Sequence, residues 1–251
     1  MSATVTTAAL SLALLALMFI PLERVFPARP GQPTLRHEWA IDLAFFLGQY
    51  LVFAGVAVAI LVRVDAAAQF LSLKPYAAAL PLWLLIALSF VLGDLLTYWF
   101  HRACHRYRVL WRFHAVHHSA ERLDWLAAHR EHPLDGFVTQ ICVNLPAILL
   151  GLPFAAIGSL IAFRGLWAIF IHSNVRLPLG PLRLLFGAPE LHHWHHARVD
   201  TRHNFANLAP YLDVIFGTYH CPEDPETYPL GLTEPWPRRY LAQLIRPFRG
   251  S

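Results

Sequence analysis

Four long apolar stretches constrain this chain most, because stretches of this length form membrane-spanning helices. The first three cover about residues 5–21, 40–62 and 77–100, and each approaches the roughly 20 residues that a helix needs to cross a bilayer. The fourth, residues 137–171, is broken by two prolines and a glycine. Because it is too long for one span and short for two, we expect a helical hairpin that does not cross completely.

Composition agrees with a membrane protein. Hydrophobic residues make up 56% of the chain and charged residues 14%, whereas soluble domains average roughly 25% charged residues. We therefore predict an all-α fold, a multi-pass membrane helical bundle of about three spans plus a helical hairpin. It forms a single integral membrane domain with N-terminal membrane helices (1–88), a central core (89–218) and a Pro-rich C-terminal tail (219–251), which includes a short amphipathic helix near 238–245.

The basic residues predict the topology. The few residues before the first apolar run contain no Lys or Arg, so we expect a membrane helix there rather than a signal peptide. Arginines cluster between the first two runs and after the third, which places both regions on the cytoplasmic side, and we expect a bacterial inner membrane. The net charge of +4 includes no basic patch interleaved with aromatic residues, so no nucleic acid is expected.

Eight histidines fall into three short motifs. His101 and His105 form an HxxxH motif, and two HxxHH motifs contain His114, His117 and His118, and His192, His195 and His196. Residues three and four apart share one face of a helix, so each motif can direct two or three ring nitrogens to one point. Eight imidazoles exceed the four ligands that zinc usually takes. The pattern therefore predicts a two-metal site in a cytoplasmic helical cap, although imidazole alone does not identify the metal.

One acidic residue shares a helical stripe with the first motif. Asp94 lies seven residues before His101. It could accept a hydrogen bond from the second ring nitrogen of a ligand histidine, or it could pair with an arginine. The three cysteines are far apart and contain no CxxC motif, so they indicate free thiols rather than a metal site.

The histidine motifs and their flanks resemble the fatty acid hydroxylase/sterol desaturase superfamily. The resemblance lies in residues 94–105, in residues 111–119, and in residues 191–197 with the following segments 204–207 and 216–218. It implies a membrane enzyme with two iron ions that uses dioxygen to hydroxylate, desaturate or otherwise oxidise a lipid. It also implies two further ligands, His132 and His172, which brings the predicted set to ten, with His129 as the alternative to His132. The resemblance identifies neither the lipid nor the reaction.

The expected partners follow from the same resemblance. We find no haem, flavin or dinucleotide motif, so electrons would come from a separate ferredoxin, or from a b-type cytochrome with its reductase, and we expect no fused carrier domain. Two alternatives remain open. A metal transporter would place its ligands midway through the spans. A zinc-dependent membrane hydrolase would need a carboxylate beside the metal, for which the candidates are Glu121, Asp124, Glu131 and Asp200.

Overall fold

The computed structural model is helical throughout, as predicted, and describes residues 3–249 except 72, 200 and 223–225. Within these residues the only extended pairings are the isolated bridges Pro27–Val175 and Ala197–Leu230. The longer helices are α1 (Ala3–Val25), α2 (Trp39–Gly48), α3 (Ala54–Ala68), α5 (Leu82–Arg106), α6 (Arg108–His118), α7 (Pro133–Leu149) and α8 (Phe154–His172). The shorter ones are η1 (Gln49–Phe53), η2 (Gln69–Leu71), α4 (Lys74–Ala77), η3 (Ala127–His129), η4 (Gly180–Leu184), α9 (Pro189–His195), α10 (Tyr211–Ile215), α11 (Tyr240–Ile245) and η5 (Arg246–Phe248).

Among the described residues, four helical segments are long and apolar enough to cross a membrane. They are α1, α5, α8 and the continuous segment Trp39–Ala68, which consists of α2, η1 and α3. The predicted hairpin is the pair α7 and α8. Pro146 lies inside α7, and the turn comes at Gly151, whose φ of +74° favours glycine. Of the two hairpin helices, only α8 meets the length of a full span, whereas α7 is shorter.

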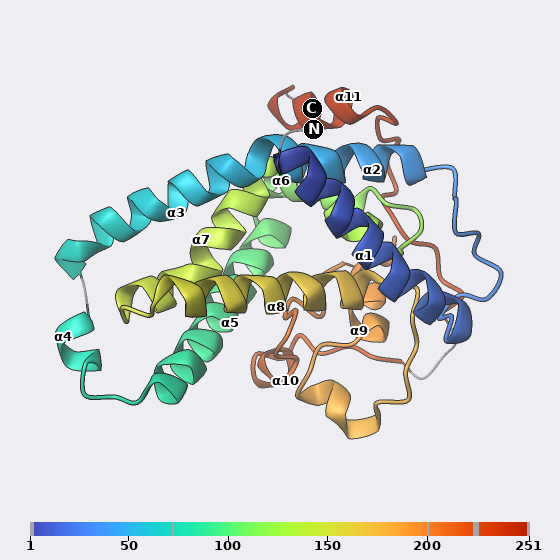
Figure 1. Cartoon of the computed structure of the whole chain (residues 1–251). Helices are drawn as coiled ribbons and strands as arrows, with labels where there is room; N and C mark the ends of the chain where they lie inside the picture. The colour runs from blue at the N-terminus through green and yellow to red at the C-terminus, as the bar shows by residue number, and fades with distance from the viewer. Residues whose placement is uncertain (1–2, 72, 200, 223–225, 250–251) are drawn as a thin grey trace.

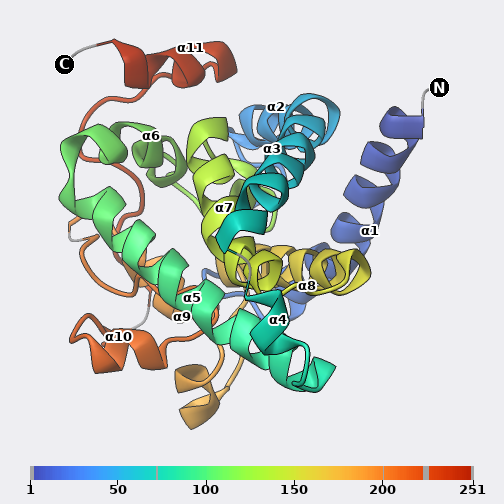
Figure 2. The same ribbon diagram turned by 90° about the vertical axis from the view of Figure 1, so that its left-hand side faces the viewer.

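The helices bring the histidine motifs together at one end of the bundle. Helix α5 packs along α7, and the extended backbone of Tyr107 turns the chain from α5 directly into α6. Helix α9 packs against α8. Figure 1 shows α8 running towards α9, and Figure 2 shows α5 running up towards α6, below α11. The ends of α5 and α8 therefore meet the short helices α6 and α9, which carry the HxxHH motifs.

A buried ionic network supports this end of the bundle. Asp42, an interruption of the second apolar run, accepts hydrogen bonds from Arg36 and from Arg130. The Arg36 guanidinium also donates to both carboxylate oxygens of Asp124, at 2.7 and 2.8 Å, and that of Arg130 to Glu38 at 2.7 Å. Asp42 is 0% exposed and Arg130 1%. Buried charges need such partners, so the network fixes the segment before α2 against the loop that follows α6.

We predict that Arg130→Met destabilises the protein by about 3–5 kcal/mol, because it leaves the buried Asp42 with one partner fewer. Thermal and chemical unfolding in detergent would measure the change. The control is Arg122→Met, since Arg122 is exposed in the same loop. Equal stability of the two variants would show that the network contributes little.

Candidate metal centre

Five histidines from three helices form the first ligand group. His101 and His105 lie one turn apart at the end of α5, His114 and His118 one turn apart on α6, and His195 lies on α9. Each offers one ring nitrogen, and all five nitrogens lie within 4.8 Å of one another. The helix ends are therefore placed so that one ion could contact all five imidazoles.

Four histidines form the second group. His117 comes from α6, His172 from the last residue of α8, His192 from α9, and His196 directly follows α9. The His172 Nε2 lies 3.0 Å from the His117 Nε2 and 2.8 Å from the His192 Nε2. The His196 Nε2 is 3.1 Å from that of His192. Four ring nitrogens thus converge on a second point.

Each HxxHH motif divides its histidines between the two groups. The first and last histidines of a motif join one group, and the middle one joins the other. Helix geometry explains the division. At about 100° per residue, positions four apart differ by about 40°, whereas the middle histidine lies about 100° from the last one. The two motifs have opposite assignments: His195 joins the pair His114 and His118, and His117 joins the pair His192 and His196.

Hydrogen bonds fix the tautomers of most of these rings. The Nδ1 atoms of His101 and His195 donate to the backbone carbonyls of Phe205 (2.7 Å) and His203 (2.6 Å). The His114 Nδ1 donates to the Asp135 carboxylate at 2.8 Å. In the second group, two further Nδ1 atoms donate to backbone carbonyls, from His117 to Arg130 at 3.1 Å and from His172 to Ala168 at 2.6 Å. These bonds leave the Nε2 lone pairs for a metal ion.

The residues fit two transition-metal ions. In the first group all five Nε2 atoms are buried without a hydrogen-bond partner in the protein, which is costly for polar atoms. In the second group the Nε2 atoms face one another, and a bound cation would satisfy their lone pairs. Burial lowers the pKa of His118, His192 and His196, and that of His195 to about 3. These four rings are therefore neutral at pH 7, which is the form that binds metal.

His132 lies outside both groups, so nine of the ten histidines that were predicted as ligands converge and His132 does not. Its Nδ1 accepts a hydrogen bond from the backbone N–H of Leu134 at 3.2 Å, and its Nε2 donates to the carbonyl of Leu244 at 3.1 Å. The ring thus caps the N-terminus of α7. The alternative, His129, is in neither group either, and its Nδ1 lies 3.0 Å from the Gln49 side-chain oxygen.

The structure distinguishes between the two alternatives for Asp94. Asp94 pairs with Arg164, so the ion-pair interpretation is correct for it. The carboxylate that positions a ligand histidine is instead Asp135, which sequence analysis missed. Local sequence gives no signal for Asp135, because it reaches His114 only through the packing of α7 against α5 and α6. His193 faces away from the metal groups, as its motif position suggests, and donates to Glu226 at 2.6 Å.

Of the carboxylates named for a hydrolase, the three that the structure describes do not join the two groups. Asp124 belongs to the ionic network, and Glu121 is exposed. Burial, followed by the nearby Asp135 charge, raises the pKa of Glu131 to about 8. Asp200 lies outside the described residues. Among the described residues, the ligand atoms of both groups are therefore all imidazole nitrogens.

We predict that each group holds one metal ion. His118→Ala and His196→Ala should each reduce the metal content of the purified protein from two ions per chain to one, because each removes a ligand from a different group. Elemental analysis measures this directly. His132→Gln is the matched control and should retain both ions. Loss of an ion from that variant would contradict the placement of His132 outside the groups.

We predict that Asp135→Asn lowers metal affinity about 10–100-fold, as is typical when the partner of a ligand histidine is changed. The asparagine keeps the size of the side chain but removes the charge opposite the His114 Nδ1. Competition with a chelator would measure the change. Glu121→Gln removes an exposed carboxylate and should leave the affinity unchanged; equal affinities for the two variants would argue against a role for Asp135.

Comparisons with known proteins agree with this geometry. The family model for fatty acid hydroxylase matches residues 86–218, which include all nine converging histidines. Ornithine lipid hydroxylase OlsE of Rhizobium tropici is 36% identical over 67% of this chain and 51% of its own length. The alkylglycerol monooxygenases of Danio rerio and Homo sapiens are each 32% identical, over 66% and 55% of this chain.

The chain spans about half the length of the first of these relatives, and 37% and 31% of the two monooxygenases. No solved structure gives a significant match. The family match nevertheless covers more than half of the 251 residues and contains the complete set of converging imidazoles. The protein therefore belongs to the fatty acid hydroxylase family.

Proposed function

We propose that this protein is a membrane-bound di-iron oxygenase that uses dioxygen to hydroxylate or desaturate a C–H bond of a lipid. The observation that carries the proposal is the pair of all-imidazole groups at the ends of apolar helices. Iron bound there would supply the redox chemistry that activates dioxygen. The five imidazoles of the first group exceed the four ligands that zinc usually takes. The monooxygenases among the relatives also favour a redox metal such as iron over a zinc hydrolase.

The protein's own residues would position the lipid and exclude water. A mainly apolar cavity of about 410 Å³ lies beside the end of α5 and reaches His105. Trp99, Tyr107 and Phe205 line it, and Trp99 and Tyr107 are also exposed on the outer surface. An aliphatic chain could enter here from the bilayer. The buried setting of the histidines keeps bulk water away from the reacting C–H bond.

The names of the relatives support a lipid or long-chain substrate. They include an ornithine lipid hydroxylase, alkylglycerol monooxygenases and very-long-chain aldehyde decarbonylases. The oxygenase would receive electrons from a separate ferredoxin or b-type cytochrome. We place the metal centre on the cytoplasmic side, which the arginines after the third apolar run support.

The test is oxygen incorporation. The protein, purified in detergent and loaded anaerobically with ferrous iron, is mixed with a bacterial lipid extract, a ferredoxin with its reductase, and ¹⁸O₂. We expect a lipid product that carries one ¹⁸O, or one that has lost two hydrogens, and the His118→Ala/His196→Ala variant should form neither. Tight binding of zinc with no oxygen-dependent product, after iron loading has been verified, would overturn the proposal.

A further inference from the structure

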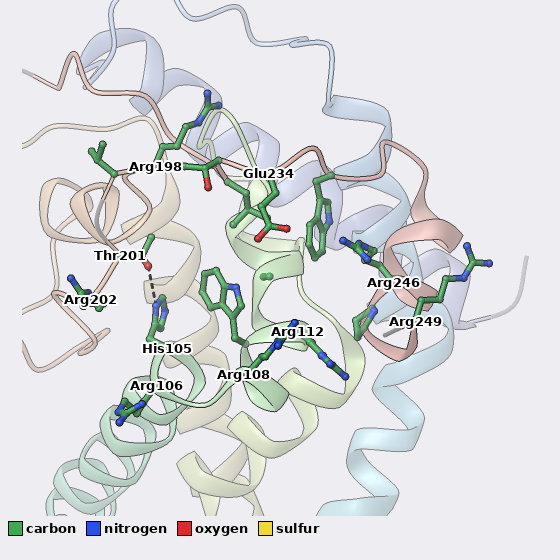
Figure 3. Close-up of a pocket in the computed structure, with 18 residues that line it drawn as sticks. His105, Arg106, Arg108, Arg112, Arg198, Thr201, Arg202, Glu234, Arg246 and Arg249 are labelled. Carbon is green, nitrogen blue, oxygen red and sulfur yellow. Dashed lines mark hydrogen bonds between the residues drawn. The ribbon is translucent and has the colours of Figure 1, made fainter. Parts of the chain in front are cut away.

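A cavity with many arginines lies beside the first histidine group. It has a volume of about 680 Å³, and His105, one of the five ligands of that group, forms part of its wall. Figure 3 shows arginines on all sides: Arg108 and Arg112 from α6 below, Arg246 and Arg249 on the right, and Arg198 and Arg202 on the left. With Arg106 at the end of α5, seven arginines line the cavity.

Among the described residues that line this cavity, positive charge greatly exceeds negative charge. Glu234 is the single acidic residue among those that line it. The Nε atoms of Arg112 and Arg198 are buried without a hydrogen-bond partner, and the Arg246 guanidinium lies over the Trp236 ring at 5.6 Å. Guanidinium groups bind carboxylate and phosphate through paired hydrogen bonds. An anion would therefore satisfy these donors and relieve the repulsion between them.

This cationic cavity adjoins the apolar cavity beside α5. Both are lined by His105, Arg106 and Arg202. The first cavity thus offers mainly positive charge, and the second offers aromatic surface with arginines at its edge. His105 lies where the two cavities meet. A molecule with an anionic head and an aliphatic chain would match both at once.

We propose that the cationic cavity binds the anionic headgroup, a phosphate or carboxylate, of the lipid substrate, while the chain occupies the apolar cavity. This inference rests on the proposed lipid oxygenase function and adds the substrate class. It places the oxidised carbon close to the junction of headgroup and chain, because that part of the lipid passes His105. A cavity of this size fits a small molecule, and one of its lining residues is a histidine of the first group. A lipid headgroup therefore suits the cavity better than the surface of an acidic carrier protein would.

Binding is tested apart from catalysis. Equilibrium dialysis of the iron-loaded protein in detergent would compare dioctanoyl phosphatidate, neutral dioctanoylglycerol and inorganic phosphate. We expect the phosphatidate to bind at least tenfold more tightly than either of the others. Arg112→Gln should weaken phosphatidate binding about tenfold, as expected for the loss of a charged hydrogen bond, and should leave dioctanoylglycerol binding unchanged. Arg112→Lys should restore part of the affinity.

Matched controls exclude general effects of charge and folding. Arg122→Gln removes an exposed arginine that lines neither cavity and should bind phosphatidate like the parent. Each variant must retain the parent's metal content and unfolding temperature. Inorganic phosphate that binds as tightly as phosphatidate would overturn the lipid assignment. So would an Arg112→Gln variant that binds phosphatidate normally but is reduced more slowly by an acidic carrier.

The outcomes separate this inference from the proposed function. Selective, Arg112-dependent phosphatidate binding without any oxygenated product would support the headgroup site and contradict the oxygenase. Oxygenation of neutral and anionic lipids with the same KM, unaffected by Arg112→Gln, would support the oxygenase and overturn the headgroup site.

Discussion

Nine imidazoles, most of them buried, direct ring nitrogens to two points inside the protein, and much of the surrounding structure serves to hold them there. Such an arrangement is unfavourable in an apolar interior, because polar nitrogens lose their hydrogen bonds to water and face one another. Two bound cations would remove that cost. Most Nδ1 atoms donate hydrogen bonds to backbone carbonyls or to Asp135, which orients the Nε2 atoms toward the two points. The centre therefore depends on backbone positions as much as on the histidines themselves.

The buried ionic network belongs to the same support. The carbonyl of Arg130 accepts the hydrogen bond from the His117 Nδ1, while the Arg130 side chain pairs with Asp42 and Glu38. One residue thus connects the beginning of the second membrane segment to a ligand of the second group. Two polar residues, Asp42 and Gln49, interrupt the second apolar run. The ion pair with Arg130 explains Asp42, and a hydrogen bond from the Gln49 side chain to the His129 carbonyl at 3.2 Å explains Gln49.

Two cavities lie beside this centre. Each reaches His105, whose Nδ1 lies 3.2 Å from the Thr201 hydroxyl. Trp111 and Phe205 pack against the same imidazole, with ring centroids at 5.0 and 5.3 Å. Of the nine histidines, His105 is thus the one that lines these two cavities, whereas the histidines of the second group are buried. Our proposals place the lipid in these cavities, beside His105.

Local sequence patterns were sufficient to predict the helices and the histidines within each motif. The apolar runs predicted the long helices, the break near Gly151 predicted the hairpin turn, and the spacing of three and four residues placed the imidazoles on shared helical faces. These features depend on local periodicity, which is visible in one segment at a time. The division of the motifs between the two groups depends on packing, because the orientation of α6 against α9 brings His195 to His114 and His117 to His192. Tertiary packing also directs His132 to the carbonyl of Leu244 and Asp135 to His114. These contacts join residues that are distant in the chain, and packing between helices is not encoded in the spacing of any single motif.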